Sequence, residues 1–305
     1  MSYSKVCIIG GSGFIGTRLA ARLIDKSNIS LKIADKIPSK SFPDSSVLCD
    51  VRFPEQLREA MSDCDVIINL AAEHRDDVSP LSLYEDVNVG GARNICTVAA
   101  KENIKTIIFT SSVAIYGFAP IGTDESGLVA PFNEYGRTKY EAEKIFKAWQ
   151  AESPNERTLV VIRPTVVFGE KNRGNVYNLL KQISSGRFVM IGKGENRKSI
   201  AYVENVAAFI EYGMGFGPGV YVYNFVDKPD FTMNALVMKV NKKLGRSSGI
   251  SFRLPFMLGY IIGIGFDLAA KVTNKNFQLV QLELKNSAQI LFIIQLLMSL
   301  VLYRQ

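Results

Sequence analysis

The sequence predicts an α/β fold, a doubly wound parallel sheet with a smaller lobe following it. Three observations predict it. Short apolar runs alternate with segments of helical periodicity through the first half of the chain, a glycine-rich turn joins the first run to the first helix, and this rhythm loosens after Arg163-Pro164. Alternation of this kind is typical of parallel strands covered by helices on both faces.

The expected strands are short runs of apolar, mostly β-branched residues, and the expected helices have apolar positions three and four residues apart. Strands are expected at 6–9, 31–34, 47–49, 66–70, 106–110 and 159–162, and helices at 14–26, 54–61, 83–100 and 134–152. We therefore expect a nucleotide-binding domain over 1–168. A substrate lobe over 169–276 is indicated by Gly and Asn clusters at 169–175 and 192–196.

Composition excludes several classes of protein. The chain of 305 residues is 47% hydrophobic and 21% charged, which is a globular composition. Its net charge of +7 contains no run of five basic residues, so nucleic-acid binding is disfavoured. Residues 1–4 leave no room for a secretory signal, which favours the cytoplasm.

Cysteine and histidine content limits the available chemistry. The four cysteines are far apart and form no C-x-x-C pair, which predicts reduced thiols in the core. The only histidine is His74, so we expect no metal site and no Ser-His-Asp triad. Acid-base chemistry must use another residue.

A dinucleotide fingerprint opens the first helix. Gly10, Gly13 and Gly16 follow the strand at 6–9, and this spacing allows a tight turn that brings backbone amides close to a pyrophosphate. Asp35 ends the second strand, where a carboxylate accepts hydrogen bonds from ribose hydroxyls and repels a 2′-phosphate. NAD is therefore favoured over NADP. The alternative is a plain strand-turn-helix. The other expected cofactor contacts are Phe14, Ile15, Asp50, Val51, Leu70, Ala71, Ala72, Asn88, Tyr135, Lys139 and Arg163, with a turn-capping role as the alternative for Asp50.

Tyr135 and Lys139 begin the helix after the fifth strand. Their i, i+4 spacing places both side chains on one face. A cation beside a phenol lowers the phenol's pKa, which makes tyrosine a plausible base where no histidine is available. Taken alone, such a pair is more often part of a solvated helix face.

A resemblance adds to this interpretation. The segment Thr110–Gly117, the glycine fingerprint, Tyr135 and Lys139 together resemble the extended short-chain dehydrogenase/reductase family, its sugar epimerase and dehydratase group, over residues 5 to about 210. The resemblance implies an NAD-dependent isomerase. It also implies that Ser112 binds the reacting sugar oxygen, that Tyr135 transfers the proton, and that Lys139 binds the nicotinamide ribose and stabilises the phenolate.

The residues after the fifth strand distinguish the reactions within that family. The dehydratases have Thr-Asp-Glu-Val-Tyr-Gly there, whereas Ser112 is followed by Val113 and Ala114, so elimination lacks its acid and base. Asp124 and Glu125 lie in a later loop and are expected to be solvated. The serine-valine form resembles the 4-epimerases, which implies a transient 4-keto sugar and an NAD that is regenerated in each turnover.

Two further segments suggest the sugar carrier. Residues 71–89 and 169–180 resemble the branch of bacterial 4-epimerases that convert N-acetylglucosamine to N-acetylgalactosamine on undecaprenyl diphosphate for O-antigen assembly. Loop cations suit a diphosphate, although Arg197 equally fits an ordinary basic surface and the two asparagines could merely turn the chain. The expected substrate contacts are Ser112, Asn172, Arg173, Asn175, Arg197 and Lys198.

Three other functions stay open. One is a 4-epimerase of soluble UDP-glucose or UDP-N-acetylglucosamine, the second is an NAD-dependent dehydrogenase or reductase, and the third is a non-catalytic NAD-binding regulator. The intact Ser112, Tyr135 and Lys139 disfavour the last of these.

The C-terminal third is unusually apolar. The segment 254–270, with Lys271 and Lys275 after it, suits the cytoplasmic face of the inner membrane as a peripheral contact, with a buried helix as the alternative. From about Phe277 the family resemblance stops, and 277–305 is an apolar tail that fits either a frameshifted or truncated terminus or an anchor. The resemblance also implies a homodimer through the helices at 83–100 and 134–152.

Overall fold

A computed structural model of the chain describes residues 5–75, 78–186, 188–247, 249, 253–255 and 257. The chain divides into two compact units. The first unit comprises Met1–Lys171 and Ala201–Val226, and the second comprises Asn172–Ile200 and Asp227–Gln305. Most of the apolar segment 254–270 and all of the tail 277–305 lie outside the described residues.

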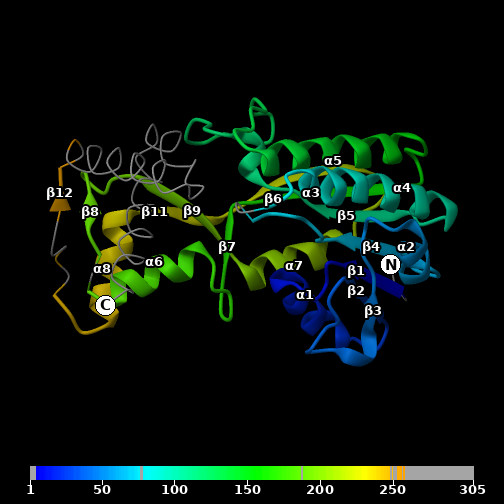
Figure 1. The fold of residues 1–305 in the computed structure, drawn as a ribbon, viewed down its shortest axis with the longest axis horizontal. Coiled ribbons are helices and arrows are strands. Elements are labelled where there is room, and N and C mark those ends of the chain that lie inside the picture. Colours follow the sequence, from blue (N-terminus) through cyan, green and yellow to red (C-terminus); the bar gives the residue numbers. More distant parts are fainter. Residues whose placement is uncertain are drawn as a thin grey trace. The chain divides into compact units, whose positions relative to one another are not determined.

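The first unit is built on a seven-stranded sheet (Figure 1). Its order is β10-β6-β5-β4-β1-β2-β3, and every neighbouring pair is parallel. The strand order reverses between β1 and β4, and in open α/β sheets ligands bind at this switch point, outside the carboxyl ends of the strands. The strands are β1 Lys5–Ile9, β2 Ser30–Asp35, β3 Ser46–Leu48, β4 Val66–Asn69, β5 Thr106–Thr110, β6 Thr158–Pro164 and β10 Gly219–Phe225.

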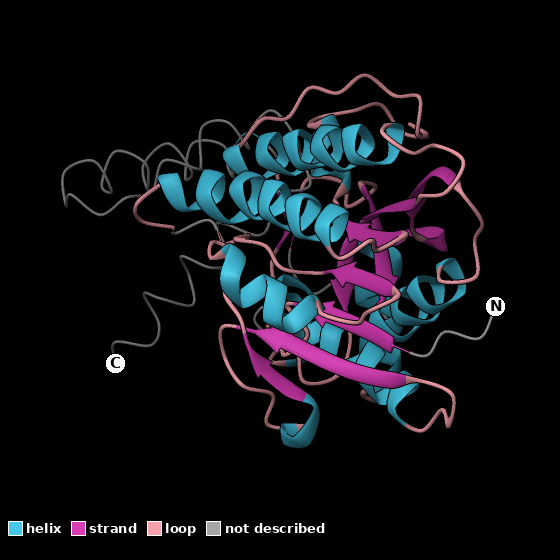
Figure 2. Ribbon diagram, turned by 90° about the vertical axis from the view of Figure 1, so that its right-hand side faces the viewer, coloured by secondary structure: helices cyan, strands magenta, loops and turns pink. Residues whose placement is uncertain are grey.

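Helices cover both faces of this sheet, as Figures 1 and 2 show. Along β1, Cys7 and Ile9 face the core beneath α2, α4 and α5, whereas Val6 and Ile8 face the core beneath α1 and α7. This alternation explains why β1 is apolar throughout, because both of its faces are buried. The helices are α1 Phe14–Ile24, α2 Pro54–Met61, α3 Ser82–Tyr84, α4 Gly91–Lys101, α5 Glu134–Ala151 and α7 Val203–Gly213.

Shorter elements complete the first unit: the turns η1 Pro43–Ser45 and η3 Val113–Tyr116, a π-helical turn η2 Glu85–Gly90, and the strand β7 Val166–Phe168. The six strands and four helices expected in the first half are confirmed, with η2 inserted between α3 and α4. All four cysteines are buried and free, which confirms their prediction as reduced core residues.

The second unit begins at Asn172, near the expected boundary at 169, but it is not one continuous segment. Residues 201–226 return to the first unit, where β10 pairs with β6 and places Tyr221 opposite Val160. Tyr221, Tyr223 and Phe225 of β10 pack against the core on the α7 face. Pairing between strands far apart in the chain leaves no local signal, so the substrate lobe expected over 169–276 is interrupted.

The second unit has its own core. Ile183, Phe188, Met190, Ile191, Met233 and Val237 are buried together. Its elements are α6 Asn175–Ser184, β8 Met190–Ile191, β9 Arg197–Tyr202, whose last two residues belong to the first unit, β11 Asp227–Thr232, α8 Met233–Lys243 and β12 Arg253–Leu254. Among the described residues, no helix combines the length and the apolar character that crossing a bilayer requires.

Candidate active site

The glycine-rich turn after β1 is pressed against its neighbours. Gly10 has a φ of +76° and its N–H donates to the Ala34 carbonyl at 2.7 Å. A Cβ at Gly10 would lie 2.6 Å from the Ala71 nitrogen, and one at Gly16 would lie 2.5 Å from the Gly11 Cα. The backbone therefore needs glycine at both positions, as the dinucleotide fingerprint requires.

We expect Gly10→Ala to lose bound NAD and to lower thermal stability, because the new methyl group would overlap the backbone after β4. The matched control is Gly122→Ala, where φ is +90° but no atom lies within 4 Å of the added Cβ. That control should show only the backbone strain of about 1–2 kcal/mol. NAD content of the purified proteins and their melting temperatures provide the test, and equal NAD retention in both variants would contradict the expectation.

Several polar groups around the turn fit NAD. Asp35 ends β2, and its carboxylate oxygens accept from the Ser12 N–H at 3.1 Å and from the Ile37 N–H at 3.0 Å, which leaves lone pairs for ribose hydroxyls. Among the described residues, the buried hydroxyls of Ser12 and Ser111 have no hydrogen-bond partner. Buried hydroxyls are normally paired, so both are suited to contacts with a bound dinucleotide.

Two of the predicted cofactor residues are occupied by the protein itself. The Asp50 carboxylate accepts from the guanidinium of Arg52 at 2.6 Å and from its backbone N–H at 3.0 Å, which lowers the pKa of Asp50. The Asn88 amide clamps the backbone of Glu73 and donates to the Thr138 hydroxyl at 3.0 Å. Asp50 therefore caps its own turn, and Asn88 holds the loop after β4 against α5. Contacts of Phe14, Ile15, Asp50, Val51, Leu70, Ala71, Ala72 and Asn88 with the cofactor stay predictions.

Ser112 and Tyr135 meet where the loop after β5 approaches the start of α5. The Asn133 side chain caps α5 by accepting from the Gly136 N–H at 2.9 Å, which places Tyr135 in the first turn. A Cβ at Gly136 would lie 2.5 Å from the Ala114 carbonyl oxygen, so only glycine allows this approach. The Ser112 hydroxyl accepts from the Ala114 N–H at 3.1 Å and lies close enough to the phenol of Tyr135 to lower its pKa.

Lys139 lies in the interior, only 2% exposed. Its ammonium donates to the Thr110 carbonyl at 2.7 Å and lies 4.7 Å from the centroid of the Phe109 ring. Desolvation lowers the pKa of Lys139 to about 7, although the Glu143 carboxylate opposes the shift.

The pKa of Tyr135 is raised, mainly by burial, even though the hydrogen bond with Ser112 acts in the opposite direction. This corrects the expectation that Lys139 depresses it. The lysine ammonium is directed to the Thr110 carbonyl, so the i, i+4 spacing alone does not couple the two groups.

The buried lysine has a consequence for stability. In the unfolded chain its pKa returns to 10.5, so between about pH 7 and pH 10.5 the unfolded state binds more protons than the folded state. The charged form of Lys139 therefore destabilises the fold most fully below pH 7, and this loss of stability fades as the pH rises towards 10.5.

We expect Lys139→Met to raise the melting temperature of NAD-free protein at pH 6, with the gain shrinking at higher pH. Melting curves across this range test it, with exposed Lys144→Met as the control; a gain that grows with pH would contradict it.

Arg163 belongs to a buried network, and its contact with the cofactor stays a prediction. The side chain is 4% exposed and binds the Glu143 carboxylate through Nε at 2.9 Å and Nη2 at 2.6 Å. Its Nη1 donates to the Tyr116 hydroxyl and to the Glu125 carbonyl. Four of the five guanidinium N–H groups thus have protein partners.

The sequence did not single out Glu143, Tyr116 or Asn224, whose side-chain oxygen accepts from Tyr116 at 2.9 Å. The available signal was the position of Glu143, four residues after Lys139 on α5. Glu125 is exposed, as expected, yet its carboxylate also accepts from the Asn224 N–H at 2.6 Å. It is therefore held at the end of β10 rather than being wholly solvated.

The predicted substrate residues other than Ser112 lie in the second unit. The Asn172 side chain accepts from the Gly174 N–H at 2.9 Å, and Arg173 and Asn175 are exposed near the start of α6. Arg197 and Lys198 lie on strand β9 instead of the expected loop, because they pair with β11. Neighbouring residues of a strand point to opposite faces, so these two side chains diverge.

Known proteins resemble this chain in sequence and in fold. The model of the NAD dependent epimerase/dehydratase family matches residues 6–222. The N-acetyl-alpha-D-glucosaminyl-diphospho-ditrans,octacis-undecaprenol 4-epimerase of Escherichia coli O157:H7 is 48% identical over 282 residues, covering 92% of this chain and 84% of that protein. The UDP-glucose 4-epimerase of Vibrio cholerae is 29% identical, over 68% of this chain and 65% of that protein.

Solved structures agree on the fold. The UDP-glucuronic acid 4-epimerase from Bacillus cereus, in complex with NAD, has a TM-score of 0.71 at 19% identity and covers 82% of this chain and 87% of that structure. The UDP-N-acetylglucosamine 4-epimerase from Methanobrevibacter ruminantium has a TM-score of 0.68 at 24% identity, over 84% of this chain and 85% of that structure. The family match agrees with the doubly wound sheet, with the glycine turn and with the presence of Ser112, Tyr135 and Lys139. The chain therefore belongs to the NAD dependent epimerase/dehydratase family and uses NAD.

Proposed function

We propose that this enzyme is a 4-epimerase that interconverts N-acetylglucosamine and N-acetylgalactosamine on undecaprenyl diphosphate for surface polysaccharide synthesis. The observation that carries the reaction is the placement of Ser112, at the carboxyl end of β5, close enough to the phenol of Tyr135 to lower its pKa. The choice of sugar carrier is supported by the relative from Escherichia coli O157:H7, which is 48% identical.

The proposed mechanism uses three residues of the first unit. Ser112 holds the C4 oxygen of the sugar, and Tyr135 accepts its proton as a phenolate and returns it from the phenol after the sugar has turned over. Bound NAD supplies the oxidation and re-reduction of C4, so no net redox change results. Lys139, whose buried ammonium donates to the Thr110 carbonyl, would hold the nicotinamide ribose.

The residues after Ser112 favour epimerisation over loss of water. Val113 and Ala114 form the turn η3, and neither can act as an acid or a base. Asp124 is exposed, and its carboxylate accepts a hydrogen bond from the Ser126 hydroxyl at 2.6 Å. This hydrogen bond lowers the pKa of Asp124. Neither residue of the Asp124-Glu125 pair is therefore needed in the proposed reaction.

Diphosphate and acetamido recognition is assigned to the second unit. We infer that Arg173 supplies charge to the diphosphate, with Asn172 and Asn175 near the sugar substituents, and that Arg197 or Lys198 contributes, but not both, because their side chains diverge along β9. We also propose that the protein associates peripherally with the cytoplasmic face of the inner membrane. We further propose that it forms a homodimer through α4 and α5.

A comparison of two substrates tests the function. Purified full-length protein with NAD is supplied with undecaprenyl-diphosphate-linked N-acetylglucosamine or with UDP-N-acetylglucosamine, and the hexosamine released by mild acid is identified. We expect epimerisation of the lipid-linked sugar. Turnover of only the UDP-sugar would replace the proposed carrier, and the accumulation of free NADH with substrate would identify a net dehydrogenase instead.

A further inference from the structure

Positive charge is concentrated in the second unit. Residues 172–200 and 227–257 contain twelve lysines and arginines but only three acidic residues. Residues 1–171 and 201–226 contain twenty basic and twenty-four acidic residues. The chain's net charge of +7 therefore arises outside the first unit, which carries the NAD turn and the proposed catalytic residues. Charge of one sign on one unit favours a partner of the opposite sign.

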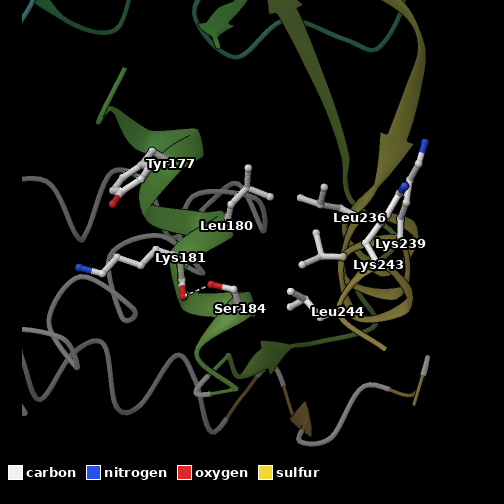
Figure 3. Close-up of a pocket in the computed structure, with 9 residues that line it drawn as sticks. Tyr177, Leu180, Lys181, Ser184, Leu236, Lys239, Lys243 and Leu244 are labelled. Atoms are coloured by element: carbon white, nitrogen blue, oxygen red, sulfur yellow. Dashed lines mark hydrogen bonds between the residues drawn. The ribbon is translucent and has the colours of Figure 1, made fainter. Parts of the chain in front are cut away.

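An apolar groove of about 480 Å³ lies between α6 and α8 of that unit. Figure 3 shows Leu180 of α6 facing Leu236 of α8 across it, and Val240 also lines it. At its edges Tyr177 is 42% and Leu244 is 47% exposed. Leu180, Leu236 and Val240 are half-buried along the groove, so its apolar floor is partly open to water between two exposed apolar side chains.

Lysines border this groove. Lys239 and Lys243 line it from α8, Lys181 lines it from α6, and Lys242 lies in the last turn of α8 beside them. In Figure 3 the lysine ammonium groups point away from the apolar side chains. All three lysines of α8 are exposed, and none forms an ion pair with any residue that the structure describes. An apolar centre with a cationic border is the pattern of a protein surface that rests on an anionic bilayer.

We propose that the groove between α6 and α8, with Lys239, Lys242 and Lys243, docks on the surface of a bilayer that contains anionic phospholipid. The inference rests on the proposed function, because a lipid-linked sugar is presented at a membrane. The apolar side chains of the groove enter the headgroup region while the three ammonium groups meet lipid phosphates. A second copy of the chain on this face would bring like charges together, and a nucleic acid would leave the leucines in water.

Vesicle sedimentation with the full-length, NAD-loaded protein tests this surface. The vesicles contain phosphatidylglycerol and phosphatidylethanolamine, and phosphatidylcholine vesicles serve as the neutral comparison. Each lysine near an anionic surface contributes about fivefold to binding, so Lys239→Glu/Lys242→Glu/Lys243→Glu should weaken it by at least about a hundredfold. The control Lys5→Glu/Lys40→Glu/Arg58→Glu makes the same charge change at exposed sites of the first unit, away from α4 and α5, and should bind like the wild type. Tyr177→Ser/Leu244→Ser should weaken binding with the charge unchanged.

The outcomes separate this inference from the proposed function, because vesicle binding is measured without any sugar substrate. Unchanged binding of the α8 variant, or equal losses in both charge variants, would overturn the docking surface even if the lipid-linked sugar is epimerised. A change in oligomeric state of the α8 variant by size-exclusion chromatography would instead assign the face to a second copy, and would also overturn it. Bound NAD and circular dichroism establish that each variant is folded.

Discussion

Tyr135→Phe should reduce the turnover number of epimerisation by about 10²–10⁴-fold, the usual contribution of a positioned proton-transfer group. The phenol is the partly buried group whose pKa Ser112 lowers, and phenylalanine keeps the ring while removing the only atom that can carry the proton. The ring-packing contacts remain, so NAD retention and melting temperature should stay close to the wild type. Turnover measured on the lipid-linked substrate, with NAD content measured in parallel, checks both parts.

The control for this variant lies on the same helix. Tyr140→Phe removes a phenol that lies near Lys144, whose ammonium is 5.0 Å from the Tyr140 ring centroid, away from Ser112. We expect near-normal turnover from it. If Tyr135→Phe turned over at the wild-type rate, the proton would have to be carried by another group and the proposed mechanism would be wrong.

Glu143→Leu should lower the free energy of unfolding by about 3–5 kcal/mol, because removing one partner of a buried ion pair leaves the other charge uncompensated. Glu143 is fully buried and Arg163 is 4% exposed, and their closest contact is 2.6 Å. The unpaired Arg163 would remain between Tyr116 and the Glu125 carbonyl with no carboxylate. Urea denaturation of the NAD-free proteins measures the loss.

A second variant separates the ion pair from simple loss of packing. Replacing both partners of a buried pair by apolar residues is often close to neutral, so Glu143→Leu/Arg163→Met should recover much of the stability. Glu141→Gln removes a partly exposed carboxylate from the same helix, where it pairs with Lys144 at 2.7 Å, and should change the stability by less than about 1 kcal/mol. A double variant as unstable as Glu143→Leu would show that the pair's charge is not the cause.

The sequence by itself determined the sheet's first six strands, the NAD turn and the identities of Ser112, Tyr135 and Lys139. These features depend on neighbours along the chain. Apolar runs separated by turns specify buried parallel strands, and the glycines at 10 and 16 specify a turn that no larger side chain fits. The i, i+4 spacing also places Glu143 on the same face of α5 as Lys139. The ion-pair partner of Glu143 is Arg163, twenty residues further along the chain.

Only the tertiary structure decided how those residues are used. The pairing of β10 with β6 returned a late segment to the first unit, because strand pairing depends on surfaces that distant residues bury together. The same long-range packing directed Lys139 to the Thr110 carbonyl and committed Arg163 to Glu143. Sequence spacing specifies which face a side chain takes, whereas burial and the partners across the fold decide its charge, its hydrogen bonds and hence its role.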